Sequence, residues 1–84
     1  MAVIENQRGL HARAAARFVK LADTFSAEIT VAKDEMIVSA RSIMGLMMLA
    51  ATCGTIIKIC GSGTDAGAAV TALSDLVKRK FDEE

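Results

Sequence analysis

The chain has a single histidine, and its neighbours are residues that suit an anion. His11 stands just before a predicted helix, whose free N–H groups and positive dipole end attract negative charge. Gly9 lets the chain turn sharply ahead of it, and Arg13 can present a planar fork of donors to a phosphate. A nucleophilic imidazole beside such a site is suited to covalent phosphoryl transfer. These residues alone also allow the simpler interpretation that His11 only caps the helix.

A second segment places a hydroxyl beside an unusually apolar stretch. Ser42 is a typical helix N-cap, and residues 43–51 form the longest apolar run of the chain. We expect one face of this short helix to pack on a sheet and the other to remain open to partners, because exposed methionines adapt to several surfaces. The expected inner residues are Ile43 and Leu49, and the expected outer ones are Met44 with Met47 or Met48. The alternative is that all of them belong to the core.

Composition excludes several classes of protein. Ten Lys and Arg balance ten Asp and Glu, so there is no basic surface of the kind that binds nucleic acid. The longest apolar run is about half of the roughly 20 residues that span a bilayer, and the chain does not begin like a signal peptide, so we expect a cytoplasmic protein. Cys53 and Cys60 are too far apart for a Cys-x-x-Cys pair, and one histidine cannot form a histidine-rich metal site. No metal or other cofactor is expected.

The hydrophobic pattern predicts seven elements in the order β-α-β-β-α-β-α. The predicted strands cover residues 1–6, 27–33, 36–40 and 55–60, and the predicted helices cover 12–25, 43–51 and a final segment capped by Thr64 after a turn at 61–63. We expect a tight turn at Asp34 and Glu35, and a buried helical stripe that includes Ala15, Phe18, Ala22 and Phe25. The elements predict one α+β domain over residues 1–84, in two layers, with helices on one face of the sheet and the other face open.

Two segments of this sequence resemble one known family. Residues 9–13, Gly-Leu-His-Ala-Arg, followed by Ala-Ala-Arg-Phe-Val at 15–19, are similar to the active-site segment of HPr, the phosphocarrier of the phosphoenolpyruvate-dependent phosphotransferase system. Residues 42–49, Ser-Ile-Met-Gly-Leu-Met-Met-Leu, resemble the regulatory-serine segment of that family. The family fold is an open-faced β-sandwich, with three helices on one face of a four-stranded antiparallel sheet. The chain departs from the usual pattern with Ala14 in place of Pro. Asn6 lies five residues before His11 with Arg8 between them, which resembles the nitrogen-related NPr branch and the HPr of proteobacteria with an incomplete transport system, whereas the Ser-Ile-Met-Gly segment resembles kinase-regulated HPr.

The resemblance implies a role for each matching residue. His11 would be phosphorylated at Nδ1 by enzyme I, itself charged by phosphoenolpyruvate, and would pass the group to an enzyme IIA protein. Arg13 would steady the phosphoryl group, and Ser42 would be the target of the ATP-dependent HPr kinase/phosphorylase. The residues expected at the partner-docking surface are Leu10, Ala14, Met44, Gly45, Met47 and Met48. The chain would then be a monomeric carrier rather than an enzyme, serving sugar transport or nitrogen regulation.

Two other functions are compatible with parts of this pattern. A regulatory binding module of the same fold, controlled by phosphorylation of Ser42, would need no carrier activity, but it would also have no use for an intact His11 and Arg13. A small hydrolase would need a positioned base or water, and the sequence offers no second histidine or clustered carboxylates near His11.

Overall fold

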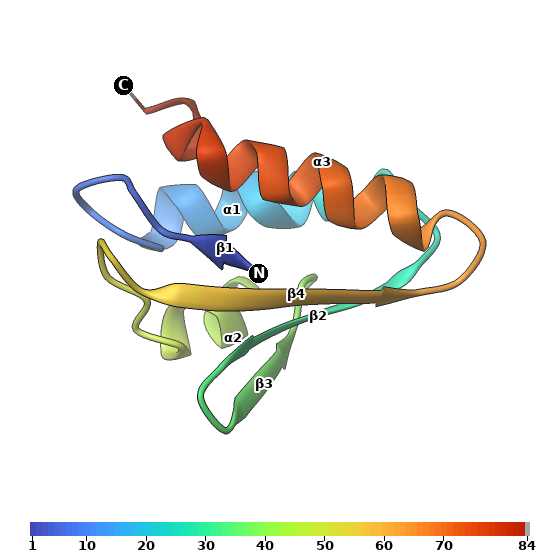
Figure 1. Cartoon of the computed structure of the whole chain (residues 1–84), viewed down its shortest axis with the longest axis horizontal. Coiled ribbons are helices and arrows are strands. Elements are labelled where there is room, and N and C mark those ends of the chain that lie inside the picture. The colour runs from blue at the N-terminus through green and yellow to red at the C-terminus, as the bar shows by residue number, and fades with distance from the viewer. Residues whose placement is uncertain (84) are drawn as a thin grey trace.

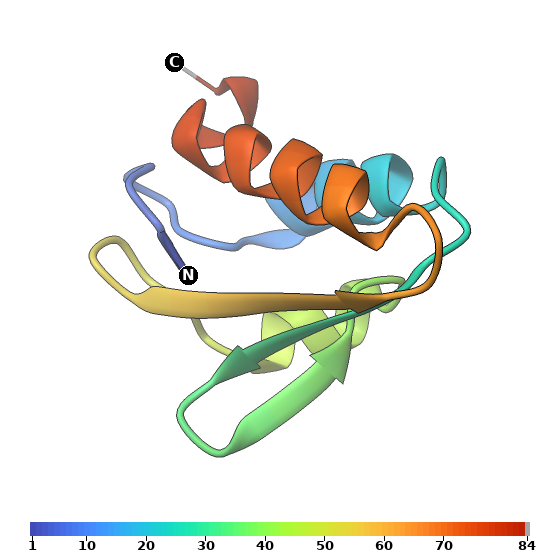
Figure 2. The same cartoon turned by 45° about the vertical axis from the view of Figure 1, so that its right-hand side comes forward.

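Residues 1–83 are described by a computed structural model, and Glu84, the last residue of the predicted domain, lies outside the described residues. The elements are β1 (Ala2–Val3), α1 (Ala12–Ala22), β2 (Glu28–Lys33), β3 (Met36–Ser39), α2 (Ile43–Met48), β4 (Ile56–Ser62), α3 (Ala66–Lys78) and the 3-10 turn η1 (Lys80–Asp82). The four strands form one antiparallel sheet in the order β1-β4-β2-β3. Figures 1 and 2 show α3 running along β4 with α1 beside it. The predicted fold class, element order and open-faced sheet are confirmed.

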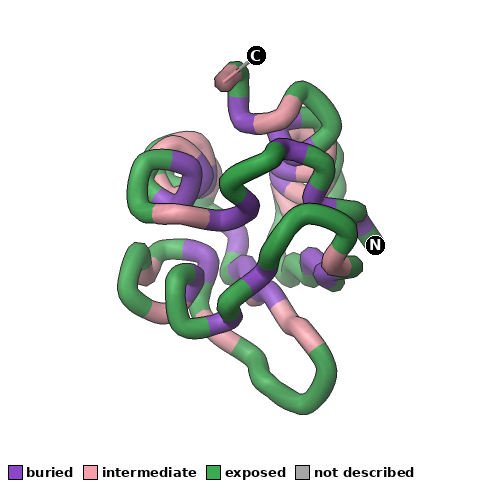
Figure 3. Tube along the Cα trace, turned by 90° about the vertical axis from the view of Figure 1, so that its left-hand side faces the viewer, coloured by how far each residue is buried: buried purple, intermediate pink, exposed green. Residues whose placement is uncertain are grey.

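The core lies between the sheet and the helices. Alternate residues of the central strands, among them Ile29 and Val31 of β2 and Ile57 of β4, are buried, as the period-two pattern of a half-covered sheet requires. The buried helical residues include Ala15, Phe18 and Ala22 of α1 and Leu73 and Val77 of α3. Figure 3, coloured by burial, shows exposed residues along the outer loops and buried ones interspersed along the helices and strands.

The β2–β3 hairpin and the Ser42 cap were predicted correctly. Lys33 pairs with Met36, so residues 34 and 35 form the turn, and Asp34 takes a left-handed φ of 54°. The hydroxyl of Ser42 accepts a hydrogen bond from the N–H of Gly45 at 2.9 Å, which satisfies one of the free donors in the first turn of α2.

Two helices end earlier than predicted. α1 ends at Ala22 rather than at residue 25, because Thr24 donates its N–H and its hydroxyl to the carbonyl of Leu21, at 3.1 and 2.7 Å, and closes a tighter turn. α2 ends at Met48 rather than at residue 51, because Ala50 has a left-handed φ of 52° that a right-handed helix does not accommodate.

Two strands also differ from their predicted bounds. β1 covers only Ala2–Val3, although Ile4 continues the contact with the segment before β4 through backbone hydrogen bonds of 2.9 and 2.7 Å. β4 continues to Ser62 because Gly61 pairs with Ile29 of β2, so the turn predicted at residues 61–63 begins later.

The predicted Thr64 cap is wrong. The N-cap of α3 is Asp65, which makes no capping hydrogen bond to its own helix. Its carboxylate instead accepts a hydrogen bond from the N–H of Ser26 at 2.8 Å and so ties the start of α3 to the segment before β2. A tertiary contact therefore takes the place of the local cap that the sequence favours.

Candidate functional site

His11 is the N-cap of α1. Its backbone is extended, with φ −81° and ψ −179°, and its Nδ1 accepts a hydrogen bond from the N–H of Arg13 at 3.3 Å. Gly9 has a φ of +66°, and an added Cβ there would lie 2.4 Å from the carbonyl oxygen of Ala51. The next residue, Leu10, donates its N–H to that carbonyl at 2.8 Å. The loop that carries His11 is thus fixed against the segment that follows α2, and only glycine fits the turn.

The other ring nitrogen of His11 contacts a residue from the opposite end of the chain. Nε2 of His11 hydrogen-bonds to Oε2 of Glu83, 72 residues away. The second oxygen of that carboxylate accepts a hydrogen bond from Nδ2 of Asn6 at 2.7 Å, and the same Nδ2 donates to the carbonyl of Gly9 at 2.7 Å. Asn6 is fully buried. The imidazole is therefore held at both of its nitrogens.

The environment of Glu83 keeps its carboxyl group ionised. Burial raises the pKa of this carboxyl, but the hydrogen bonds from Asn6 and His11, together with the charge of Arg17, outweigh that effect and leave the pKa below its ordinary value of 4.5. At neutral pH the Glu83 side chain is consequently an anion whose two oxygens face hydrogen-bond donors.

An unusual turn carries Glu83 to this place. Lys80, Phe81 and Asp82 all have left-handed backbones, with φ values of 58°, 56° and 60°. Such a run is unfavourable for residues other than glycine. Two contacts offset it: the Phe81 ring is fully buried, and Arg17 of α1 donates a hydrogen bond to the Phe81 carbonyl. The turn is thereby attached to α1, the helix that His11 caps.

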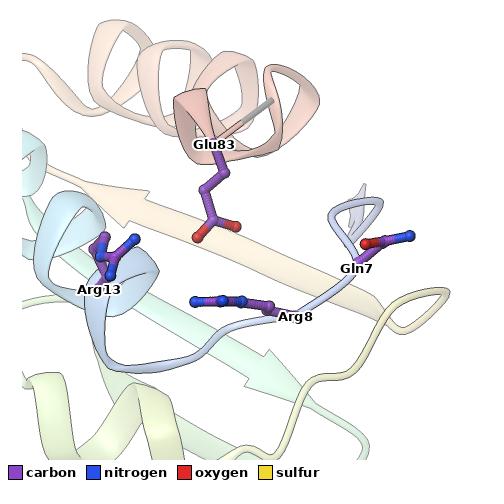
Figure 4. A pocket seen from close by; sticks show the side chains of 4 residues that line it. All are labelled: Gln7, Arg8, Arg13 and Glu83. Carbon is purple, nitrogen blue, oxygen red and sulfur yellow. The ribbon is translucent and has the colours of Figure 1, made fainter.

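A polar cleft of about 340 Å³ lies beside the histidine and is lined by Gln7, Arg8, Arg13 and Glu83. Figure 4 shows the side chains of Arg8, Arg13 and Glu83 turned toward one space, with Gln7 pointing away. Within residues 1–83 neither the Arg8 nor the Arg13 guanidinium forms an ion pair. Both groups can accordingly donate to an anion in the cleft.

The short helix α2 exposes all three of its methionines. Met44 is 71% exposed and Met48 65%, with Met47 also exposed, whereas Leu46 and Leu49 are buried. Ile43, which we expected inside, is 40% exposed, because the inward face of so short a helix is filled by Leu46.

Three of the expected docking residues lie where a partner has little access. Leu10 and Ala14 are buried in the core, Ala14 completely, because Leu10 lies under the loop of His11 and Ala14 is on the inward face of α1. Gly45 is half-buried, and an added Cβ there would lie 3.0 Å from the hydroxyl oxygen of Ser42 and 3.2 Å from the Cβ of Val38 in β3. The exposed part of the expected surface is therefore Met44, Met47 and Met48.

Neither a metal-binding cluster nor a membrane-spanning helix is found in the described residues. In residues 1–83 no group of three His, Cys, Asp or Glu side chains is arranged to hold a metal ion. Over the same range, no helix combines the length and the apolar character needed to cross a membrane.

Comparison with known proteins identifies the family. A family model described as the PTS HPr component phosphorylation site matches residues 1–79. The chain belongs to the HPr family. HPr of Neisseria meningitidis is 46% identical over 80 residues, which cover 95% of this chain and 90% of that protein. NPr of Shewanella violacea is 49% identical over 78 residues, covering 93% of this chain and 86% of that protein. A crystal structure of HPr from Thermoanaerobacter tengcongensis superposes with a TM-score of 0.92 at 48% identity, covering 98% of this chain and 92% of that one.

The two HPr motifs therefore lie at two helix N-termini, His11 on α1 and Ser42 on α2. Members of this family are phosphocarriers of the phosphotransferase system. Sequence reasoning missed Glu83 entirely, and it noted Asn6 and Arg8 only for their spacing from His11. No local signal points to Glu83, because its place follows from how α3 and its left-handed turn pack on α1.

Proposed function

We propose that this chain carries a phosphoryl group on Nδ1 of His11, received from phospho-enzyme I and passed to an enzyme IIA protein. The observation that carries the proposal is the position of Nδ1, which faces the first N–H groups of α1 beside a cleft with two guanidinium groups. A phosphoryl group bonded to Nδ1 would take the place of that hydrogen bond and receive the N–H of Arg13 on one of its oxygens.

Arg13 and Arg8 are the proposed phosphate-stabilising side chains. Both line the cleft, and neither guanidinium is engaged in an ion pair within residues 1–83. Charge-assisted hydrogen bonds from a guanidinium are among the stronger polar contacts that a protein can offer to a phosphate. The chain then acts as a carrier rather than an enzyme, since it holds the group covalently between two partners and releases no product of its own.

The exposed face of α2 is the proposed docking surface for these partners. Met44, Met47 and Met48 form an apolar patch, and their flexible side chains suit more than one partner. Gly45, between them, contributes a half-buried backbone. Leu10 and Ala14 support the patch from the core rather than contact a partner.

Ser42 is the proposed regulatory site, phosphorylated by an HPr kinase/phosphorylase. A phosphate there would lie at a helix N-terminus, where negative charge is favoured, so the fold would persist. The same phosphate would place about −2 charge beside the methionine patch, and a docking partner would have to desolvate it.

We place this carrier in the cytoplasm as a monomer. Cys53 and Cys60 are both free and exposed, which suits a reducing compartment. The buried apolar residues of the core all come from one copy of the chain, and the methionines exposed on α2 are assigned to docking.

The test is a two-step transfer with purified components. Incubation with labelled phosphoenolpyruvate and enzyme I should give one acid-labile phosphoryl group, and peptide mapping should locate it on His11. Addition of enzyme IIA should then discharge it. A chain that binds enzyme I but takes up no label would be a regulatory module of the HPr fold, and label on any residue other than His11 would contradict the proposal.

A further inference from the structure

We propose that Glu83 is a positioning residue that holds His11 in the tautomer with its proton on Nε2, so that Nδ1 is left as the nucleophile. This inference rests on the proposed phosphoryl transfer at His11. It assigns a task to a residue that lies 72 positions away from the histidine and outside both HPr motifs.

Two contacts on opposite sides of the ring specify the same tautomer. An ionised carboxylate can only accept hydrogen bonds, so Nε2 must donate its proton to Glu83. The N–H of Arg13 can only donate, so Nδ1 must accept with its lone pair. A neutral imidazole that meets both requirements carries its proton on Nε2.

The carboxylate is fixed in place by its surroundings. One oxygen of Glu83 meets His11 and the other accepts a hydrogen bond from Asn6 at 2.7 Å, so the group has no freedom to rotate without losing a partner. Asn6 is fully buried and is held in turn by the Gly9 carbonyl. The Glu83 side chain is only 12% exposed, which keeps water from competing for the contact.

The same contact suits every stage of the transfer. As the N–P bond of the donor breaks and the Nδ1–P bond forms, the Nε2 proton stays where it is and the ring becomes cationic. The Glu83 carboxylate lies against that cation, on the side of the ring away from the phosphoryl group. When the Nδ1–P bond breaks during discharge, its electron pair returns to Nδ1 and the ring is neutral again. No proton has to enter or leave in either direction.

The experiment compares Glu83→Ala with Asp82→Ala. Asp82 is a matched control because it is an exposed carboxylate in the same turn and pairs with Arg79 instead of His11. Nitrogen-15 NMR of the unphosphorylated imidazole reports the tautomer, and enzyme I kinetics report kcat and KM. In Glu83→Ala we expect a mixture of tautomers and a kcat lower by about tenfold or more, with KM nearly unchanged, because a charge-assisted hydrogen bond to the ring is lost. Asp82→Ala should match the wild type in tautomer, kcat and KM.

An unchanged tautomer or an unchanged kcat in Glu83→Ala would overturn the proposal. Glu83→Gln, which keeps the length of the side chain, serves if alanine lowers the melting temperature; its amide cannot offer an oxygen to both Nε2 and Asn6, so it should change the tautomer and lower kcat in the same direction as alanine. If the wild-type chain accepts no phosphoryl group, the proposed function fails, whereas the tautomer measurement still tests the contact itself.

Discussion

The N-termini of α1 and α2 are built alike and differ in what the rest of the molecule adds to them. In α1 the N-cap His11 accepts a hydrogen bond from the N–H of Arg13 at 3.3 Å. In α2 the N-cap Ser42 accepts one from the N–H of Gly45 at 2.9 Å. Each side chain therefore stands where the free donors and the dipole of a helix favour a phosphate.

Only the first of these caps is engaged from a distant part of the chain. Glu83, itself held by Asn6, contacts the far side of the His11 ring, whereas the Ser42 hydroxyl, within the described residues 1–83, bonds only to its own helix. A helix N-terminus favours the binding of a phosphate. A side chain that accepts and then releases a phosphoryl group also needs a lone pair in a fixed orientation. This difference fits His11 as a transfer site and Ser42 as a site modified by an outside kinase.

Removal of the imidazole should have the largest effect. His11→Ala should accept no acid-labile phosphoryl group from enzyme I, because the chain has no second histidine to take its place. Circular dichroism should show the wild-type fold, since the core residues of α1 are untouched. Ser42→Ala is the matched control, with a helix N-cap altered in the same way, and it should be labelled normally. Residual transfer in His11→Ala would show that another residue accepts the phosphoryl group.

Removal of the Arg13 guanidinium should have the second largest effect on transfer. Arg13→Ala keeps the N–H that contacts His11 but loses the side chain that lines the cleft, and one charge-assisted hydrogen bond to a charged group contributes roughly 1.5–3 kcal/mol. We expect transfer slower by about tenfold or more, measured by rapid-quench kinetics, with little change in melting temperature. Arg79→Ala removes an exposed guanidinium that is not among the residues lining this cleft and should transfer at the wild-type rate. Equal rates for all three proteins would show that Arg13 is only a surface residue.

A charge at the second cap should affect docking rather than chemistry. Ser42→Asp should raise the KM of enzyme I for this chain severalfold and leave kcat nearly unchanged, because the carboxylate lies beside the apolar patch that the partner covers. Its amide NMR spectrum should change only near α2. Thr24→Asp adds the same charge at an exposed position just beyond the C-terminus of α1 and controls for net charge. A spectrum altered throughout would indicate a conformational switch, and an unaltered KM would refute the docking mechanism.

The smallest expected effect is the loss of stability when only the Ser42 cap of α2 is removed. Ser42→Ala removes the hydroxyl that accepts from Gly45, so the free energy of unfolding should fall by about 1 kcal/mol while transfer stays normal. Chemical denaturation measures the first quantity, and the same sample should be insensitive to the kinase. A stability equal to that of the wild type would mean that water replaces the cap at no cost.

The comparison of the two caps also shows what the sequence could and could not predict. Ser42, Gly9 and the order of the elements follow from local rules of capping, turns and periodicity, and the structure confirms them. Thr64 was predicted by the same local rules and is wrong, because Asp65 serves a contact with Ser26 instead of its own helix.

The part of the site that the sequence did not predict is the part formed by tertiary packing. Glu83 reaches His11 only because the Phe81 ring is buried and three consecutive residues adopt left-handed backbones. No propensity favours such a run, so the sequence pattern gave no reason to expect it. The burial of Leu10 and Ala14 was likewise unpredictable from the motif, since a motif records residue types and not the direction in which they point.

The central claim is that the lone pair of Nδ1, and not that of Nε2, receives the phosphoryl group. Nitrogen-15 and phosphorus-31 NMR of the chain charged by enzyme I tests it directly, because coupling between phosphorus and one ring nitrogen identifies the bond. We expect coupling to Nδ1 of His11, with the proton retained on Nε2 beside Glu83. Coupling to Nε2 would contradict it, since that nitrogen is the one the carboxylate covers.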